Sequence, residues 1–274
     1  MLDPSIFDKI LLHKDIQPYI VANTYLHILN NSKEFIEKHS LTTIERISQS
    51  IRFKLVTLVR VFQTILYKKY FIKQKNINSK ILFVSHLTNR QQLFQDYDSY
   101  FGDLPNQLSH HKIDSTIVLI NHINAKNPQT SSLWKDSKVH RLILNLSLDF
   151  LSEIKLYFAH RKSKKRLNYI LKELGIDKAD TKKILNNHCS ANTFNALRIA
   201  KQVTDIAEKI GAKFIITTYE GHAYERLVYY YARKLNPSIR CFGYQHAAVF
   251  ENQHAIKRSL GSEYNPDIIF ASGK

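Results

Sequence analysis

Six short apolar runs, separated by segments with helical periodicity, constrain the fold of this chain more than any other feature. They occupy residues 80–86, 115–121, 139–145, 214–218, 240–244 and 267–272. Short continuous apolar runs are typical of strands that are buried on both faces of a parallel sheet. Strands that alternate with helices form right-handed βαβ units. The sequence therefore predicts an α/β protein with a Rossmann-like parallel sheet flanked by helices.

The segments between these runs predict helices over about 91–110, 147–173 and 222–235. In the last third of the chain, apolar residues from Ala196 to Ile210 share one helical face. Gly211 follows them at the position where glycine commonly ends a helix. Asn236-Pro237 is expected to end the next helix, because the residue before proline disfavours helical backbone.

The first 78 residues have helical periodicity and no strand-like run. The polar segment 73–80 is expected to be a linker. We therefore predict two parts, which are a helical N-terminal extension over 1–78 and a Rossmann-like α/β domain over 79–274.

The charge of the chain indicates an anionic partner. It carries 40 Lys and Arg against 23 Asp and Glu, a formal net charge of +17 over 274 residues. Such a surface favours nucleic acid, phosphorylated molecules or anionic lipid. Residues 51–76 hold seven Lys and Arg and no Asp or Glu. They fit a helix that lies on an anionic membrane, although their scattered charges favour a helix packed on the main domain. The basic cluster 161–166 is a solvated helix face or a phosphate contact.

The sequence predicts a cytoplasmic protein, and peripheral attachment at the inner face of the membrane stays open as an alternative. Its first residues lack the basic region and apolar run of a signal peptide. No stretch reaches the roughly 18 uncharged apolar residues that span a bilayer. Two cysteines fit a reducing compartment, and we expect Cys189 and Cys241 to be structural.

We expect neither a cofactor nor a metal. The chain has seven glycines and lacks the GxGxxG and GxxxxGK[ST] patterns that bind phosphates. The metal-binding patterns CxxC and HExxH are absent, and so is the nucleophile pattern GxSxG.

Polar residues at the ends of the predicted strands form the candidate site. In an open parallel sheet, ligands bind beyond the carboxyl ends of the strands. The residues at those ends are Ser85, His86, Glu220, His222, Gln245, His246 and Ser272. We expect His246 and Glu220 to be catalytic, because an imidazole titrates near pH 6.5 and a carboxylate can orient it or act as the base itself. The others are candidates for substrate binding.

Each of these residues also has a structural interpretation. His86 fits an ordinary loop residue. Glu220 lies beside the start of helix 222–235, where a carboxylate is stabilised by the free N–H groups. His222 and Glu225 fit a local helix contact. The functional interpretation requires that the strands be adjacent and parallel.

Residues 217–250, TTYEGHAYERLVYYYARKLNPSIRCFGYQHAAVF, resemble bacterial surface-carbohydrate biosynthesis proteins of the GT-B glycosyltransferase type. The shared features are a strand that ends in Glu220, the helical pair Tyr224-Glu225, which is often Trp-Glu in the family, and a strand that ends in Gly243-Tyr244-Gln245-His246. The later run PDIIFASGK completes the resemblance, which covers about 60 residues. Over residues 80–216 the resemblance is topological.

The resemblance implies transfer of a sugar from a nucleotide-sugar donor to a glycan or lipid-linked acceptor, in the assembly of capsule, O-antigen of lipopolysaccharide or related glycans. GT-B enzymes place the site between two Rossmann-like domains. The first usually binds the acceptor, and the second usually binds the donor. This chain corresponds to the acceptor-side domain, so we expect the donor to bind through a missing or separate domain. We further expect the chain to be a fragment, a truncated product or half of a split enzyme.

Two rival interpretations stay open. A nucleotide-sugar epimerase or a polyol-phosphate transferase would keep the fold and change the reaction. A non-catalytic basic module would bind a membrane or nucleic acid. We do not expect nucleic acid as a partner, because no recognition motif is present and the aromatic residues fall mostly on apolar faces.

Overall fold

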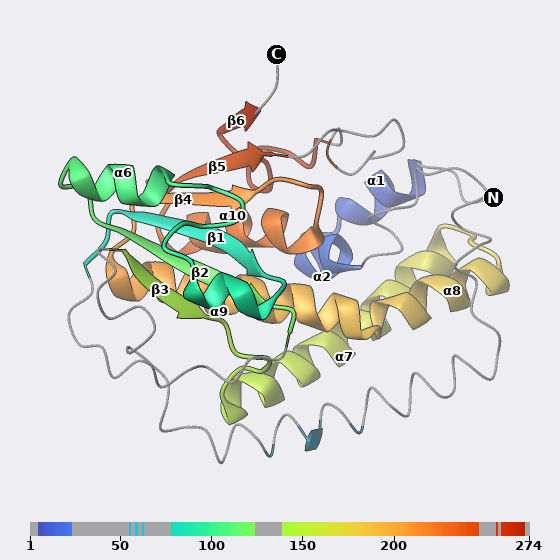
Figure 1. Cartoon of the computed structure of the whole chain (residues 1–274). Coiled ribbons are helices and arrows are strands. Elements are labelled where there is room, and N and C mark those ends of the chain that lie inside the picture. The colour runs from blue at the N-terminus through green and yellow to red at the C-terminus, as the bar shows by residue number, and fades with distance from the viewer. Residues whose placement is uncertain are drawn as a thin grey trace. The chain divides into compact units, whose positions relative to one another are not determined.

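The computed structural model describes residues 5–23, 55, 58–59, 62, 78–123, 139–246, 256 and 259–271. A six-stranded parallel sheet within them confirms the predicted fold class (Figure 1). Its strands are β1 (Ile81–Leu87), β2 (Ser115–Asn121), β3 (His140–Ile143), β4 (Phe214–Thr218), β5 (Arg240–Gln245) and β6 (Ile268–Ala271). The predicted strands match these bounds to within two residues at each end.

The order of the strands places the candidate site. It runs β3-β2-β1-β4-β5-β6, and every neighbouring pair is parallel. The chain therefore winds outward in both directions from the boundary between β1 and β4. In such a doubly wound sheet the crevice for a ligand lies at this switch point, outside the carboxyl ends of the strands.

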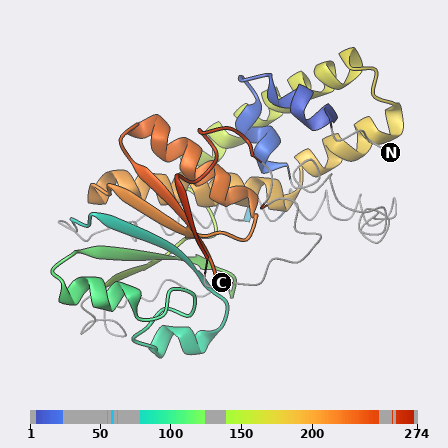
Figure 2. The same cartoon turned by 90° about the horizontal axis from the view of Figure 1, so that it is seen from above.

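Helices cover the two faces of the sheet in the manner of a doubly wound fold (Figures 1 and 2). The short helices η2 (Arg90–Phe94) and α6 (Leu104–His110) follow β1 and lie on one face. The helix α10 (Ala223–Leu235) and the part of α9 (Ala191–Ile210) from residue 199 onward lie on the other. Gly211 adopts φ +69° after α9, and α10 stops before Asn236, as predicted.

The predicted helix over 91–110 is wrong as a single element. A turn interrupts it between η2 and α6, because the Asp98 carboxylate accepts the amides of Tyr100 and Phe101, both at 2.9 Å. Gly102 adopts φ +59° in the same turn, where a residue with a Cβ would be strained. Pro105 then lies in the first turn of α6, where its missing N–H costs nothing.

The remaining helices form a second compact unit. It contains α1 (Ser5–Leu11), α2 (Gln17–Ala22), α7 (Phe150–Glu173), α8 (Lys178–His188) and the start of α9 up to residue 198. The helix α7 begins after Asp149, whose carboxylate accepts the amide of Ser152 at 3.1 Å. Thus α7 and α8, which lie inside the predicted domain 79–274, group with the N-terminal helices.

In this helical unit a buried ion pair joins α7 to α9. The Arg198 guanidinium donates to both carboxylate oxygens of Glu153, at 2.7 and 2.9 Å, and both side chains are almost wholly buried. Glu153 also accepts the amide of Leu148 at 2.8 Å, so the same carboxylate fixes the start of α7.

Of the N-terminal extension, α1 and α2 show the predicted helical structure. Most of the segment 51–76 and of the linker 73–80 lies outside the described residues. Among the helices that the structure describes, none is both long and apolar enough to cross a bilayer.

Candidate functional site

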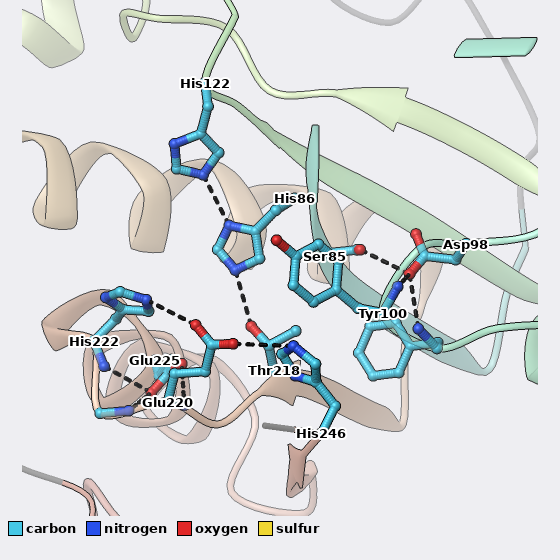
Figure 3. A network of polar contacts seen from close by, with 12 residues as sticks. Ser85, His86, Asp98, Tyr100, His122, Thr218, Glu220, His222, Glu225 and His246 are labelled. Atoms are coloured by element: carbon cyan, nitrogen blue, oxygen red, sulfur yellow. Dashed lines mark hydrogen bonds and ion pairs between the residues drawn. The ribbon is translucent and has the colours of Figure 1, made fainter. Parts of the chain in front are cut away.

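The carboxyl ends of β1, β4 and β5 bring the predicted residues together (Figure 3). His86 lies next to last in β1, Glu220 follows β4 by two residues, and His246 directly follows β5. Because these three strands are neighbours in the sheet, residues far apart in sequence meet at one edge. This is the juxtaposition that the functional interpretation requires.

Glu220 lies between two imidazoles. His222 Nε2 donates to Glu220 Oε2 at 3.2 Å, and His246 Nε2 lies 3.2 Å from Oε1 (Figure 3). The hydrogen bond from His222 lowers the pKa of Glu220, burial opposes this shift, and the nearby histidines add to it. Glu220 is therefore ionised at neutral pH. Its carboxylate fixes both rings in the tautomer that carries the proton on Nε2.

The two imidazoles differ in their surroundings. The His222 side chain is 51% exposed, whereas that of His246 is 25% exposed and its Nδ1 is buried. Burial lowers the pKa of His222, but the hydrogen bond to Glu220 and the charges of Glu225 and Glu220 outweigh it, so that the pKa lies above its ordinary value. His222 is the better placed of the two to exchange a proton with a bound molecule.

Glu225 holds the loop that presents Glu220. Its buried carboxylate accepts three amides, those of Glu220 at 2.9 Å and of Gly221 and His222 at 3.0 Å. Burial raises the pKa of Glu225 to about 7, and the nearby positive charge and the amide hydrogen bonds oppose that shift. Glu225, rather than Glu220, is thus the residue that caps α10, and Glu220 faces the histidines.

His86 is the centre of a buried network behind the carboxylate. Its Nδ1 lies 2.8 Å from His122 Nε2, and its Nε2 lies 3.0 Å from Thr218 Oγ1 and 2.9 Å from the Tyr224 hydroxyl. Burial, assisted by the charge of His122, lowers the pKa of His86 to about 3. Burial also keeps the pKa of Tyr224 well above 10. Both side chains are therefore uncharged at neutral pH and act as hydrogen-bonding supports.

His122 is a member of this site that the sequence analysis missed. It follows β2, and its amide donates to the Leu87 carbonyl at 3.1 Å. Its side chain is partly exposed and reaches His86, and burial together with His222 lowers its pKa. The rule that selected His86 would also have selected His122, because it too lies just past a predicted strand.

Ser85 points away from the imidazoles and supports a neighbouring turn instead. Its buried hydroxyl donates to Asp98 at 2.8 Å, and Asp98 in turn accepts the amide of Tyr100. The Tyr100 ring lies edge-on to His246, with the ring centroids 4.7 Å apart, and 5.0 Å from the ring of His86. Tyr100 thus forms an aromatic wall of the site, which sequence periodicity does not reveal.

The other predicted residues are not part of the group of side chains around Glu220. Gln245 ends β5 and is half-buried beside His246. Ser272 lies outside the described residues. Cys241 is buried on β5, and burial raises the pKa of its thiol to about 12, which suits a structural residue. Among the described residues, no group of three or more His, Cys, Asp or Glu side chains is arranged to hold a metal ion.

Fold and site together define a Rossmann-like α/β protein with a His-Glu-His group at the carboxyl edge of its sheet. No protein-family model matches the chain, and no curated protein matches it in sequence. Among solved structures, a hydrogen sulfide-producing enzyme from Fusobacterium nucleatum is similar at 12% identity and a TM-score of 0.21. The alignment covers 77% of this chain and 66% of that one, so this chain spans just under two thirds of that protein's length. A TM-score of this size carries no argument about function.

Proposed function

We propose that the protein is a glycosyltransferase of bacterial surface-polysaccharide biosynthesis, and that the group around Glu220 binds and deprotonates the acceptor hydroxyl. The observation that carries the proposal is the ionised carboxylate held between two imidazoles at the switch-point edge of a parallel sheet. The resemblance of residues 217–250 to GT-B proteins supports the reaction class. The proposal takes the donor to be a nucleotide sugar bound by a further domain, and the acceptor to be a glycan or a lipid-linked glycan.

The chemistry follows from the roles that the geometry favours. The acceptor oxygen forms a bond to the anomeric carbon of the donor sugar. At the same time the bond between that carbon and the nucleotide diphosphate breaks, and the electron pair of the broken bond leaves with the diphosphate. The hydroxyl proton passes to the His222 imidazole, whose Nε2 is held by Glu220. Glu220 stabilises the resulting imidazolium, and its lowered pKa suits it to this role better than to that of a base. His246 fixes the second carboxylate oxygen.

The composition of the site favours a hydroxyl-bearing acceptor over a phosphate at this position. Within the described part of the chain, the ion-pair partners of Glu220 are both histidines, and no lysine or arginine reaches it. A carboxylate and an aromatic wall, here Tyr100, suit a sugar ring and its hydroxyls. The basic surface of the chain suits a lipid-linked acceptor at the inner face of an anionic membrane.

A donor panel tests the proposal. The protein is incubated with nucleotide-activated sugars and a synthetic lipid-linked glycan, and release of nucleotide and growth of the glycan are both measured. Replacing Glu220 with Gln should lower turnover at least about a hundredfold, because the proton acceptor then loses its partner. Glu208→Gln, which alters an exposed carboxylate on α9, is the matched control and should leave turnover unchanged.

Comparison of His222→Ala with His246→Ala assigns the base, and the larger loss is expected for His222→Ala. The proposal fails if no nucleotide sugar is turned over, or if Glu220→Gln turns over at the wild-type rate. Interconversion of nucleotide sugars without glycan growth would identify an epimerase, and transfer of a phosphate-bearing polyol would identify a polyol-phosphate transferase.

A further inference from the structure

A groove between α7 and α8 is lined by four lysines. The two helices pack side by side, joined by the short turn 174–177 (Figure 1). The groove encloses about 590 Å³ and is open to solvent. Its lysines are Lys164 and Lys172 on α7 and Lys178 and Lys182 on α8.

Helical spacing explains why these side chains share one hollow. Positions 164, 168 and 172 are four residues apart along α7, and positions 178, 182 and 186 repeat that spacing along α8. Residues four apart lie on the same helical face. Gly175, at φ +69°, allows the tight turn that brings the two faces together.

The nearby carboxylates contact groups that do not line the groove. Asp177 accepts the amides of Ala179 and Asp180, at 2.8 and 2.9 Å. Asp180 forms an ion pair with Lys183 at 3.2 Å, and Glu173 accepts a hydrogen bond from the Tyr169 hydroxyl. The residues that line the groove include no Asp or Glu. Like charges four residues apart destabilise a helix, so Lys178 and Lys182 carry a cost that a bound anion would offset.

We propose that this groove binds a diphosphate group. A diphosphate carries several negative charges close together, which the four ammonium groups of the groove balance. Lysines act as point charges toward phosphate, and Asn168 and Asn186 add side-chain amides in the same hollow. The lining contains no aromatic ring on which a nucleobase could stack, so the recognised group is the diphosphate itself. This site lies in the helical unit and does not depend on the proposed reaction.

Binding of inorganic pyrophosphate, measured by calorimetry at low salt, tests the proposal. The variant Lys172→Gln/Lys182→Gln removes one ammonium from each helix and should weaken binding at least about tenfold. The matched control is Lys162→Gln/Lys165→Gln, which removes two exposed lysines of α7 outside the groove and should change binding less than about twofold. Circular dichroism is used to check that each variant is folded.

Two results would overturn the proposal. One is the absence of pyrophosphate binding at about 1 mM. The other is equal weakening by the groove variant and the control, which would indicate attraction to net charge alone.

Neutral vesicles with and without a polyprenyl diphosphate separate the sources of the ligand. Sedimentation that pyrophosphate reverses would show a lipid-borne diphosphate, whereas pyrophosphate binding without sedimentation would show a soluble one.

Discussion

Replacing Arg198 with Met should destabilise the helical unit strongly. Met keeps most of the side-chain volume but removes both hydrogen bonds to Glu153, which are 2.7 and 2.9 Å long. The Glu153 carboxylate then stays buried without its counter-ion, and the Leu148 amide still donates a hydrogen bond to it. A charge centre about 4 Å away contributes about 4 kcal/mol at an effective dielectric constant of 20. Loss of one partner of a buried pair costs about 3–5 kcal/mol.

The matched control lies one turn further along the same helix. Lys201 pairs with Asp205 at 3.3 Å, but both side chains are more than two fifths exposed. Lys201→Met should therefore cost less than about 1 kcal/mol. Urea unfolding followed by circular dichroism measures both variants. Adding Glu153→Gln to Arg198→Met should recover part of the loss, because the buried charge is gone. Equal losses for Arg198→Met and Lys201→Met would refute the reasoning.

Three further predictions concern the sheet and its site. Glu225→Ala leaves one buried amide, that of Gly221, and two partly buried amides, those of Glu220 and His222, without their acceptor, and it should lower the free energy of unfolding by about 3–5 kcal/mol, measured in urea. Gly243→Ala places a Cβ 2.8 Å from Tyr219 Cγ, so thermal unfolding should show a loss of about 1–3 kcal/mol, and an unchanged midpoint would contradict the packing. His86 has a pKa of about 3 when folded and about 6.5 when unfolded. Below pH 6.5 only the unfolded state gains its proton, so stability should fall by up to about 5 kcal/mol toward pH 3, and His86→Gln should flatten that dependence.

The sheet could be predicted from the sequence because buried parallel strands appear in it as short continuous apolar runs. Both faces of β1 and β2 are covered, so nearly every residue in them is apolar or buried. Once the strands were assigned, the rule for parallel sheets placed His86, Glu220 and His246 at one edge without any knowledge of their contacts.

The contacts themselves could not be predicted, because they depend on tertiary register. The partners of His86 include Thr218 and Tyr224, which lie 132 and 138 residues away along the chain. The turn that splits the predicted helix 91–110 depends on Asp98, whose bond to Ser85 forms only when β1 is in place.

The grouping of α7 and α8 with the N-terminal helices also escaped the sequence analysis. It rests on contacts between segments distant in sequence, such as the hydrogen bond from Asn23 to the Ile184 carbonyl at 3.2 Å. Periodicity gives the apolar face of a helix but does not say which other element covers it.

A double-mutant cycle in kcat/KM on Glu220 and His222 tests most directly whether the carboxylate and the imidazole act as one catalytic group. If they do, Glu220→Gln and His222→Ala each lower kcat/KM at least about a hundredfold, and the double variant loses little more than either one. Losses that multiply in the double variant, or single variants that keep wild-type kcat/KM, would contradict the account.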